Sequence, residues 1–226
     1  SGASANGNFK TEFELLAGDP TGTDAAIGGE LEIGGKLTVA TNCFVRFTSH
    51  PLTGASGLLK VRELQLDEGG TIDAKGRGFT GTTGFAGTTG VGPGAGSAEA
   101  ASGGHGGNGG APTEETVGLA YDDRKSPVLP GSGGVGRTTN VDQWDSSKTA
   151  SAGAGGGVIR IECKETMSLA GTVTAAGGDG KDILYGNGAG AGGSVFLCCK
   201  TWNPSDTLVI SADGGDHSGR NGYGGG

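Results

Sequence analysis

The chain has 226 residues, of which 52 are glycine and 7 are proline, and 18% are charged. Its formal net charge of -8 argues against a nucleic-acid surface or an anionic membrane face, because both need clustered lysine and arginine. Arg124-Lys125 is the only adjacent basic pair, and no apolar run approaches the roughly 18 residues of a membrane span. We therefore expect neither a nucleic-acid partner nor membrane insertion.

The glycines do not recur at every third position, which excludes a collagen triple helix. Short runs in which apolar and polar residues alternate interrupt the glycine at residues 30–33, 36–39 and 158–161. Such alternation is typical of β-strands with one buried face and one wet face. The sequence therefore predicts an ordered all-β protein with long Gly-rich loops.

Residues 1–27 are predicted to form an N-terminal strand or cap, because residues 9–16 alternate in the same way. Residues 28–75 are predicted to form the first coils of a β-solenoid. Within them we expect three short strands in residues 28–47, with Gly34-Gly35 as a tight corner. The apolar residues of the run 59–66 change parity, which predicts a second corner near Arg62-Glu63.

Residues 76–150 form a Gly-rich insertion that is unusually long for a loop inside a compact domain. Two alternatives remain open from the sequence. The segment is a mobile insertion, or its glycines allow extended polyglycine-type legs to pack closely side by side. The second alternative is favoured because large residues could anchor the legs, namely Phe79, Phe85, Tyr121, Leu129 and Trp144.

Residues 151–226 contain two copies of one unit with a period of 37 residues. The stretch 155–159 matches 192–196, and 173–179 matches 210–216, so the offset is the same at both ends of the unit. A fixed period of this size is the mark of a solenoid, whose units bury their apolar faces by stacking. Since the second period ends in register at Gly226, we expect either a continuing chain or docking of this end on a neighbouring subunit.

The four cysteines are Cys43, Cys163, Cys198 and Cys199, and they allow three pairings if all are bridged. An offset of 37 places Cys198 opposite Ile161 and makes Cys163 only its diagonal neighbour. Diagonal partners lie about 7–8 Å apart, so a bridge would need a slip in register. Buried thiols are therefore favoured, and the disulfide state stays open.

The chain resembles the Gly-rich repeat regions of large secreted or surface proteins of protists and bacteria. The residues that carry the resemblance are the run 103–110, GGHGGNGG, the strand start 155–161, and the endings of the form Ile/Val-x-Ala-x-Gly at residues 72–76, 173–177 and 210–214. The resemblance implies a parallel β-helix in an extracellular or cell-surface setting. It implies no catalytic residues, because those regions are mostly uncharacterised.

Calcium is the one cofactor that the sequence suggests. Residues 177–185 match a single Gly-Gly-x-Gly-x-Asp nonapeptide, whose candidate ligands are Asp179 and Asp182. The alternative is that these are turn aspartates that bond the backbone. Three histidines, His50, His105 and His217, share no ligand spacing and are expected to be solvated loop residues.

These observations favour a non-catalytic extracellular structural module, such as a segment of a filament, sheath, wall or adhesin, that self-associates or assembles head to tail. The alternative is a carbohydrate-binding or carbohydrate-cleaving β-helix. Tyr121, Trp144 and Trp202 are its candidate glycan-stacking residues. Carboxylates near strand ends are its candidate acids and bases, namely Asp73, Asp179, Asp182, Asp213 and Asp216, but no catalytic pair can be assigned.

Overall fold

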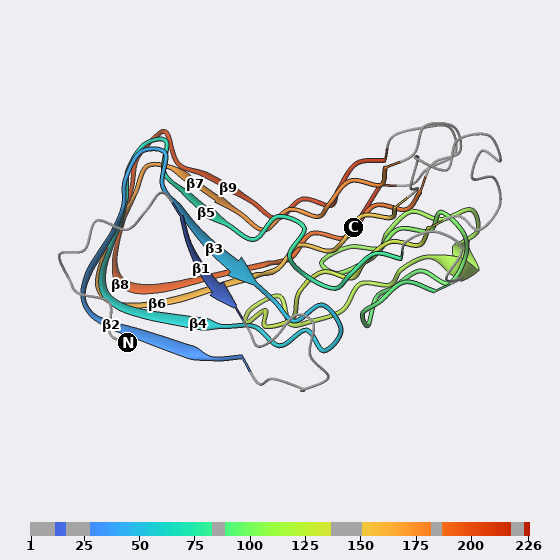
Figure 1. Cartoon of the computed structure of the whole chain (residues 1–226), viewed down its shortest axis with the longest axis horizontal. Helices are drawn as coiled ribbons and strands as arrows, with labels where there is room; N and C mark the ends of the chain where they lie inside the picture. Colours follow the sequence, from blue (N-terminus) through green and yellow to red (C-terminus); the bar gives the residue numbers. More distant parts are fainter. Residues whose placement is uncertain (1–11, 17–27, 83–88, 137–150, 182–186, 218–223) are drawn as a thin grey trace.

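The structure is a computed structural model that describes residues 12–16, 28–82, 89–136, 151–181, 187–217 and 224–226 (Figure 1). In these residues the chain forms two parallel β-sheets and no α-helix. The helical element described is the single 3-10 turn η1 (Glu114–Thr116). The all-β fold class that the alternation predicts is therefore confirmed.

The two sheets differ in the length of their strands. The sheet of short strands has the order β1-β3-β5-β7-β9 and the sheet of long strands the order β2-β4-β6-β8. The short strands are β1 (Glu12–Leu16), β3 (Phe44–Thr48), β5 (Thr71–Asp73), β7 (Thr172–Thr174) and β9 (Val209–Ser211). The long strands are β2 (Glu30–Val39), β4 (Leu58–Leu66), β6 (Val158–Leu169) and β8 (Ser194–Pro204).

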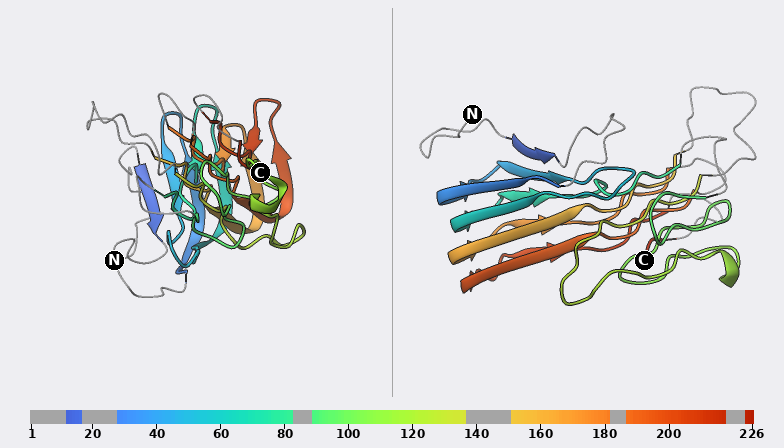
Figure 2. Two further views of the ribbon diagram at one scale, coloured as in Figure 1. Left: turned by 90° about the vertical axis from the view of Figure 1, so that its right-hand side faces the viewer. Right: turned by 90° about the horizontal axis from the view of Figure 1, so that it is seen from below.

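Each long strand and the short strand that follows it form one level of a stack. Neighbouring levels pair in parallel, so that equivalent side chains lie in rows across the sheets (Figures 1 and 2). One apolar row is Leu31–Leu59–Ile161–Leu197 and another is Val45–Ile72–Val173–Ile210. These rows face one another and build a single core between the two sheets. Each fully buried Ile or Leu contributes about 1.5–3 kcal/mol to the stack.

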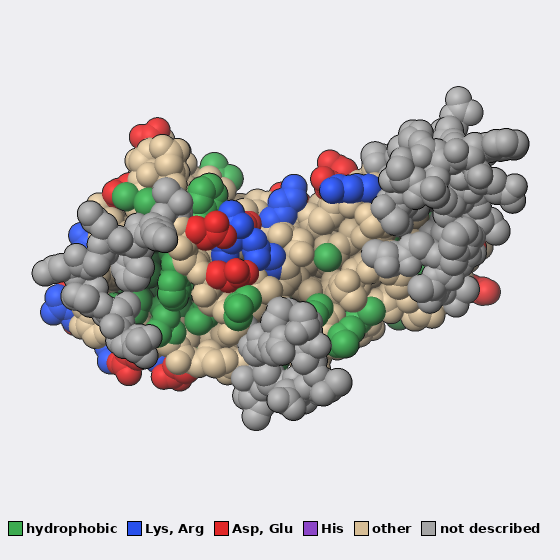
Figure 3. All heavy atoms as spheres, in the orientation of Figure 1, with side chains coloured by type: hydrophobic (Ala, Val, Ile, Leu, Met, Phe, Trp, Pro, Cys, Tyr) green, Lys and Arg blue, Asp and Glu red, His purple; other side chains and the backbone are tan. Residues whose placement is uncertain are grey.

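Ion pairs hold the first short strand on the outside of the stack. Arg46 lies 2.8 Å from Glu12, and Arg77 lies 2.8 Å from Glu14. The space-filling view shows acidic and basic side chains gathered at this place (Figure 3). Because these groups are partly exposed, each pair adds at most about 1 kcal/mol.

The long strands bend without being interrupted. Gly34 and Gly35 lie inside β2, so the prediction of two separate strands on either side of them is wrong, whereas the corners predicted there and near Arg62-Glu63 correspond to bends within β2 and β4. At both places the pairing register shifts, between Ile33 and Lys36 and between Val61 and Leu64. An extra residue of this kind bends a strand while its hydrogen bonding continues on both sides.

The predicted register of the last two long strands is also wrong, by one residue. Val158 pairs with Ser194 and Cys163 with Cys199, an offset of 36, whereas Val173 pairs with Ile210 at the expected offset of 37. The sequence period therefore does not hold in every strand. A one-residue shift exchanges the two faces of a strand, and this register places Val195, Leu197 and Cys199 against the core.

Beyond the sheets, the Gly-rich segments run side by side as extended legs (Figure 1). Backbone hydrogen bonds join them in sequence: Phe79 N–H donates to Gly131, Gly131 to Gly156, and Gly156 to Ala191, at 2.8–3.1 Å. In the insertion, residues 76–82, 101–110 and 131–136 belong to this array, whereas η1 and the loop 120–127 lie outside it. These three ranges are thus packed legs, as the second of the two alternatives predicts. Phe85 and Trp144 lie outside the described residues, whereas Phe79 is a buried anchor.

The legs approach one another so closely that most of their glycines leave no space for a side chain. A Cβ atom on Gly155 would lie 1.7 Å from the Gly131 carbonyl oxygen, and one on Gly156 would lie 1.8 Å from that of Ala175. Both distances are far below van der Waals contact, and the obstructing atoms are backbone atoms that cannot swing away. Glycine is therefore required at these positions by close packing.

Alanine at Gly156 is expected to destabilise the protein by about 3 kcal/mol or more, because the leg must move away from Ala175 and Gly193. The matched control is Gly34→Ala, since a Cβ atom at Gly34 meets nothing within 4 Å. Thermal unfolding followed by circular dichroism compares the two variants with the parent. Equal melting temperatures for both variants would contradict this account of the legs.

Candidate functional site

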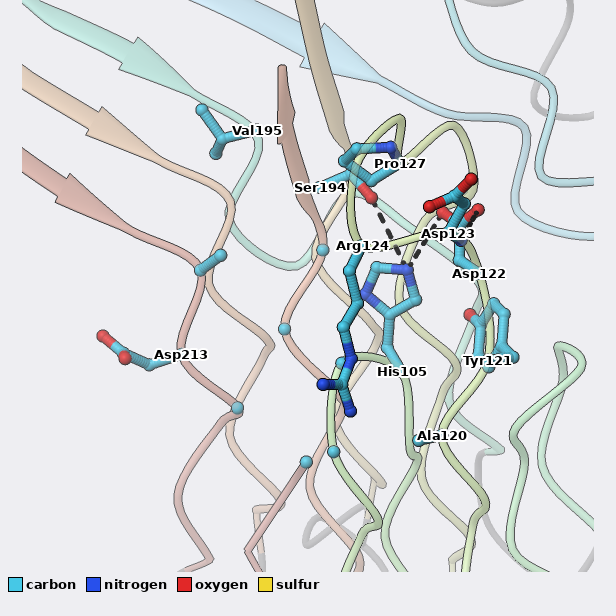
Figure 4. Close-up of a pocket in the computed structure, with 17 residues that line it drawn as sticks. His105, Ala120, Tyr121, Asp122, Asp123, Arg124, Pro127, Ser194, Val195 and Asp213 are labelled. Carbon is cyan, nitrogen blue, oxygen red and sulfur yellow. Dashed lines mark hydrogen bonds and ion pairs between the residues drawn. The ribbon is translucent and has the colours of Figure 1, made fainter. Parts of the chain in front are cut away.

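His105 lies on one of the Gly-rich legs and is only 5% exposed. Its Nε2 atom lies 3.4 Å from Oδ2 of Asp122 and 3.5 Å from Oγ of Ser194, the first residue of β8 (Figure 4). The expectation of a solvated loop histidine is therefore wrong for this residue, and it is wrong for His50, which is 4% exposed. His217 is exposed, as expected.

Asp122 closes the loop that follows Tyr121. Its backbone adopts a left-handed conformation with φ of 73°, and its carboxylate accepts backbone hydrogen bonds from Asp123, Val128 and Leu129 at 2.8–2.9 Å. Burial raises the pKa of this carboxyl group, but the backbone donors and His105 outweigh it and lower the pKa below the ordinary value of 3.8. Asp122 is thus held ionised as the centre of the loop.

Tyr121 anchors the same loop to the legs. Its ring packs edge-on against His105 with the ring centroids 4.8 Å apart. Its hydroxyl group donates to the Pro130 carbonyl and accepts a hydrogen bond from Ser132. Burial raises the pKa of this phenol. Because both ends of the side chain are engaged internally, Tyr121 positions the loop more than it offers a free surface.

A depression with a volume of about 550 Å³ lies beside His105. One wall is the loop 120–127, and the other is formed by residues 192–195 and 212–214. Figure 4 shows the Arg124 side chain extending from the first wall, with Asp213 on the opposite wall. Among the described residues, no ion pair of Arg124 is found. The depression therefore combines a free guanidinium group with carboxylates and backbone amides.

The grouping of Ser194, His105 and Asp122 does not have the geometry of a nucleophilic triad. In a triad the acid and the hydroxyl group contact different nitrogens of the imidazole ring, so that the acid orients the ring through one nitrogen while the other takes the hydroxyl proton. Here both contact Nε2. In addition, Ser194 donates its proton to the Leu129 carbonyl at 2.7 Å. The three side chains hold the loop against β8.

Of the predicted site residues that the structure describes, Tyr121 and Asp213 line the depression together, and Asp179 and Asp216 are in contact. Asp73 forms ion pairs with Arg46 and Arg77, and Asp213 accepts a hydrogen bond from Ser211. Asp179 accepts a hydrogen bond from the Asp216 backbone at 3.0 Å. Within the described residues, no group of three His, Cys, Asp or Glu side chains could hold a metal ion. Asp182 and Trp144 lie outside these residues.

Trp202 lies near the far end of β8, about 25 Å along the strand from Ser194, so it shares no surface with Tyr121.

Sequence reasoning missed Asp122, Arg124 and Ser194. A signal for them exists: His105 and Asn108 are the two polar side chains in the run 103–110, which otherwise consists of glycine. A bulky polar residue in such a leg indicates partners from other segments.

No family model, curated protein or solved structure matches the chain. In the part of the chain that the structure describes, no helix has the length and hydropathy needed to cross a membrane.

Asp122→Asn is expected to destabilise the protein by about 2 kcal/mol at pH 7, because three backbone donors lose an ionised acceptor. The folded-state pKa of Asp122 is lowered, so its stabilising effect is complete above the unfolded-state pKa and is lost as the pH falls through the folded-state value. The difference in the free energy of unfolding between parent and variant, measured by urea unfolding, should therefore shrink below pH 3.8. The control is Asp123→Asn, since Asp123 is exposed and its carboxylate accepts a hydrogen bond from the Lys125 backbone. A difference independent of pH would contradict the assigned role.

Proposed function

We propose that the protein is a non-catalytic, extracellular structural module, a β-solenoid that assembles head to tail with further copies of itself. One observation carries the proposal. The apolar rows of the stack lose their cover at the last level: Val173 is fully buried, whereas Ile210, next in its row, is 46% exposed. In the long-strand sheet, Met167 is fully buried and its partner Trp202 is 44% exposed.

A further level would cover these side chains. Strands β8 and β9 each pair on one side only among the described strands, so their other edges offer parallel hydrogen-bonding positions. At the opposite end of the stack, β1 and β2 are the outermost described strands, and Leu16 is 47% exposed. Placing one end on the other keeps all strands parallel. Such a contact joins unlike surfaces and therefore extends into a filament or closes into a ring.

Charge is compatible with this head-to-tail arrangement. Strand β8 carries Lys200 and no carboxylate, and strands β1 and β2 together carry four glutamates and one lysine. The four glutamates and Lys200 already form ion pairs with neighbouring levels of the same chain. A head-to-tail contact extends these rows of ion pairs by one level, whereas contact between two β1–β2 ends brings like charges together.

The extracellular setting is supported by the resemblance to Gly-rich repeat regions of secreted and surface proteins. A mechanical role is supported by the legs, in which backbone packs on backbone over the length of the array. A module built in this way offers few side chains for chemistry and a rigid frame for assembly.

Light scattering coupled to gel filtration is expected to show assemblies larger than a monomer, with a share that rises with protein concentration and falls with added salt. Ile210→Arg should shift the protein to the monomer by placing a charge in the uncovered row. The matched control is Leu119→Arg, because Leu119 is 61% exposed and belongs to neither β8 nor β9. A parent protein that stays monomeric at its highest soluble concentration would overturn the assembly.

The depression beside His105 favours a second candidate function, the binding of a surface glycan. Arg124 could donate to sugar hydroxyl or carboxylate groups, Asp123 and Asp213 could accept from hydroxyl groups, and Pro127 and Val195 add apolar contact. Small binding sites combine a few convergent polar groups with apolar lining in this way.

A glycan array followed by calorimetry tests this second function. Arg124→Ala and Asp213→Ala should each weaken binding about tenfold or more, because each removes a charged hydrogen-bonding partner. Lys125→Ala is the control, since Lys125 is a neighbouring exposed cation that does not line the depression. The absence of any bound glycan, or equal affinity in all variants, would remove the glycan function. Turnover of a bound glycan that is lost in Asp213→Ala would instead contradict a non-catalytic role.

A further inference from the structure

Cys163 and Cys199 are the two cysteines that the register brings directly opposite each other. They are Cα partners on the parallel strands β6 and β8. Parallel neighbours lie about 4.8 Å apart across a sheet, and the Cα atoms of disulfides are usually about 4.4–6.8 Å apart. The distance argument that disfavours a bridge at an offset of 37 therefore does not apply at the actual offset of 36.

Both side chains also point to the same side of the sheet. Cys163 is buried in the core, and Cys199 is partly buried against the same core. Cys198 faces the opposite side and is exposed, and Cys43 precedes β3 in the other sheet. Among the four cysteines, the register thus singles out one pair.

From this geometry we propose that Cys163 and Cys199 form a disulfide bond in an oxidising environment, and that this bond staples the edge strand β8 to β6. The proposal rests on strand register and holds whether or not the protein assembles head to tail. Such bonds persist mainly in secreted and surface proteins, so it also agrees with an extracellular setting.

Two local features allow the sulfur atoms to meet. The pair lies beside a shift in register, between Cys163 and Thr166, where the strand is already irregular. Strand β8 is the outermost described strand of its sheet, so it can move by a few tenths of an ångström without disturbing a second neighbour. In the reduced state, the Cys163 thiol contacts the carbonyl oxygens of Arg62 and Thr166 at 3.3 and 3.4 Å. These are weak bonds, and little is lost when the thiol proton leaves.

Oxidised glutathione can serve as the oxidant. The Cys199 thiolate attacks one of its sulfur atoms and releases one reduced glutathione. The Cys163 thiolate then attacks the Cys199 sulfur of the mixed disulfide and releases a second. One S–S bond thus replaces two protein thiols, whose two electrons and two protons appear on two glutathione thiols. Cys199 reacts first because it is the more accessible thiol, and because burial raises the pKa of Cys163.

Peptide mapping of the native protein tests the proposal. The protein is treated with oxidised glutathione, free thiols are alkylated, and trypsin is added. We expect a disulfide between peptide 161–164 and peptide 182–200, with Cys43 alkylated. Because the second peptide contains Cys198 as well as Cys199, the bond should persist in Cys198→Ser and disappear in Cys199→Ser. Circular dichroism of both variants checks that they are folded.

Reduction of the bridged protein should lower its melting temperature by about 5–10 °C, because the bond closes a loop of about 35 residues. Reductant should leave the melting temperature of Cys199→Ser unchanged. A bridge from Cys163 to Cys198, a Cys198–Cys199 bond, or complete alkylation of Cys163 after oxidation of the native protein would each overturn the assignment. Loss of head-to-tail assembly with the bridge intact would affect only the proposed function.

Discussion

The contact on which the structure depends is that of backbone against backbone in the legs. Gly153 and Gly190 illustrate it, since a Cβ atom on either would lie 1.9 Å from a carbonyl oxygen of another leg. At such separations each peptide group can bond to a neighbouring leg, so the buried polar backbone is satisfied without a regular sheet. The legs continue the levels beyond the sheets, and they bring the loop 120–127 to the start of β8, where the depression forms.

The sheets and the legs meet this requirement for close packing in different ways. In the sheets, large apolar side chains such as Leu59 and Ile161 fill the space between two layers, and burial of their surface drives the packing. In the legs, glycine has no side chain, so the backbones of neighbouring levels come close together. A stack that contains both sheets and legs has a strongly defined order of levels, because every row of residues is repeated from one level to the next. The same repetition explains why the last level leaves an apolar row uncovered.

The cluster around His105 is the polar exception within the legs. It joins three distant segments, those of His105, Asp122 and Ser194, through hydrogen bonds that each need a buried partner. Buried polar groups that are satisfied in this way specify a unique arrangement, because displacement of one leg leaves the others unpaired. The cluster therefore fixes the wall of the depression from which Arg124 extends, whereas the Asp213 carboxylate on the opposite wall points away from Arg124 (Figure 4).

The sequence by itself determined the all-β class and where most strands begin, because alternation of apolar and polar residues is a local property of the chain. Composition alone also indicated that glycine serves packing as well as turns. Tertiary structure decided the rest. The register of β8 against β6 follows from which face meets the core, and this choice turned Cys199 rather than Cys198 toward Cys163. Likewise, His105, Asp122 and Ser194 are up to 89 positions apart, and only the packing of the legs brings them into contact. No local sequence pattern encodes these tertiary contacts, because the free energy that stabilises them comes from residues in distant segments of the chain.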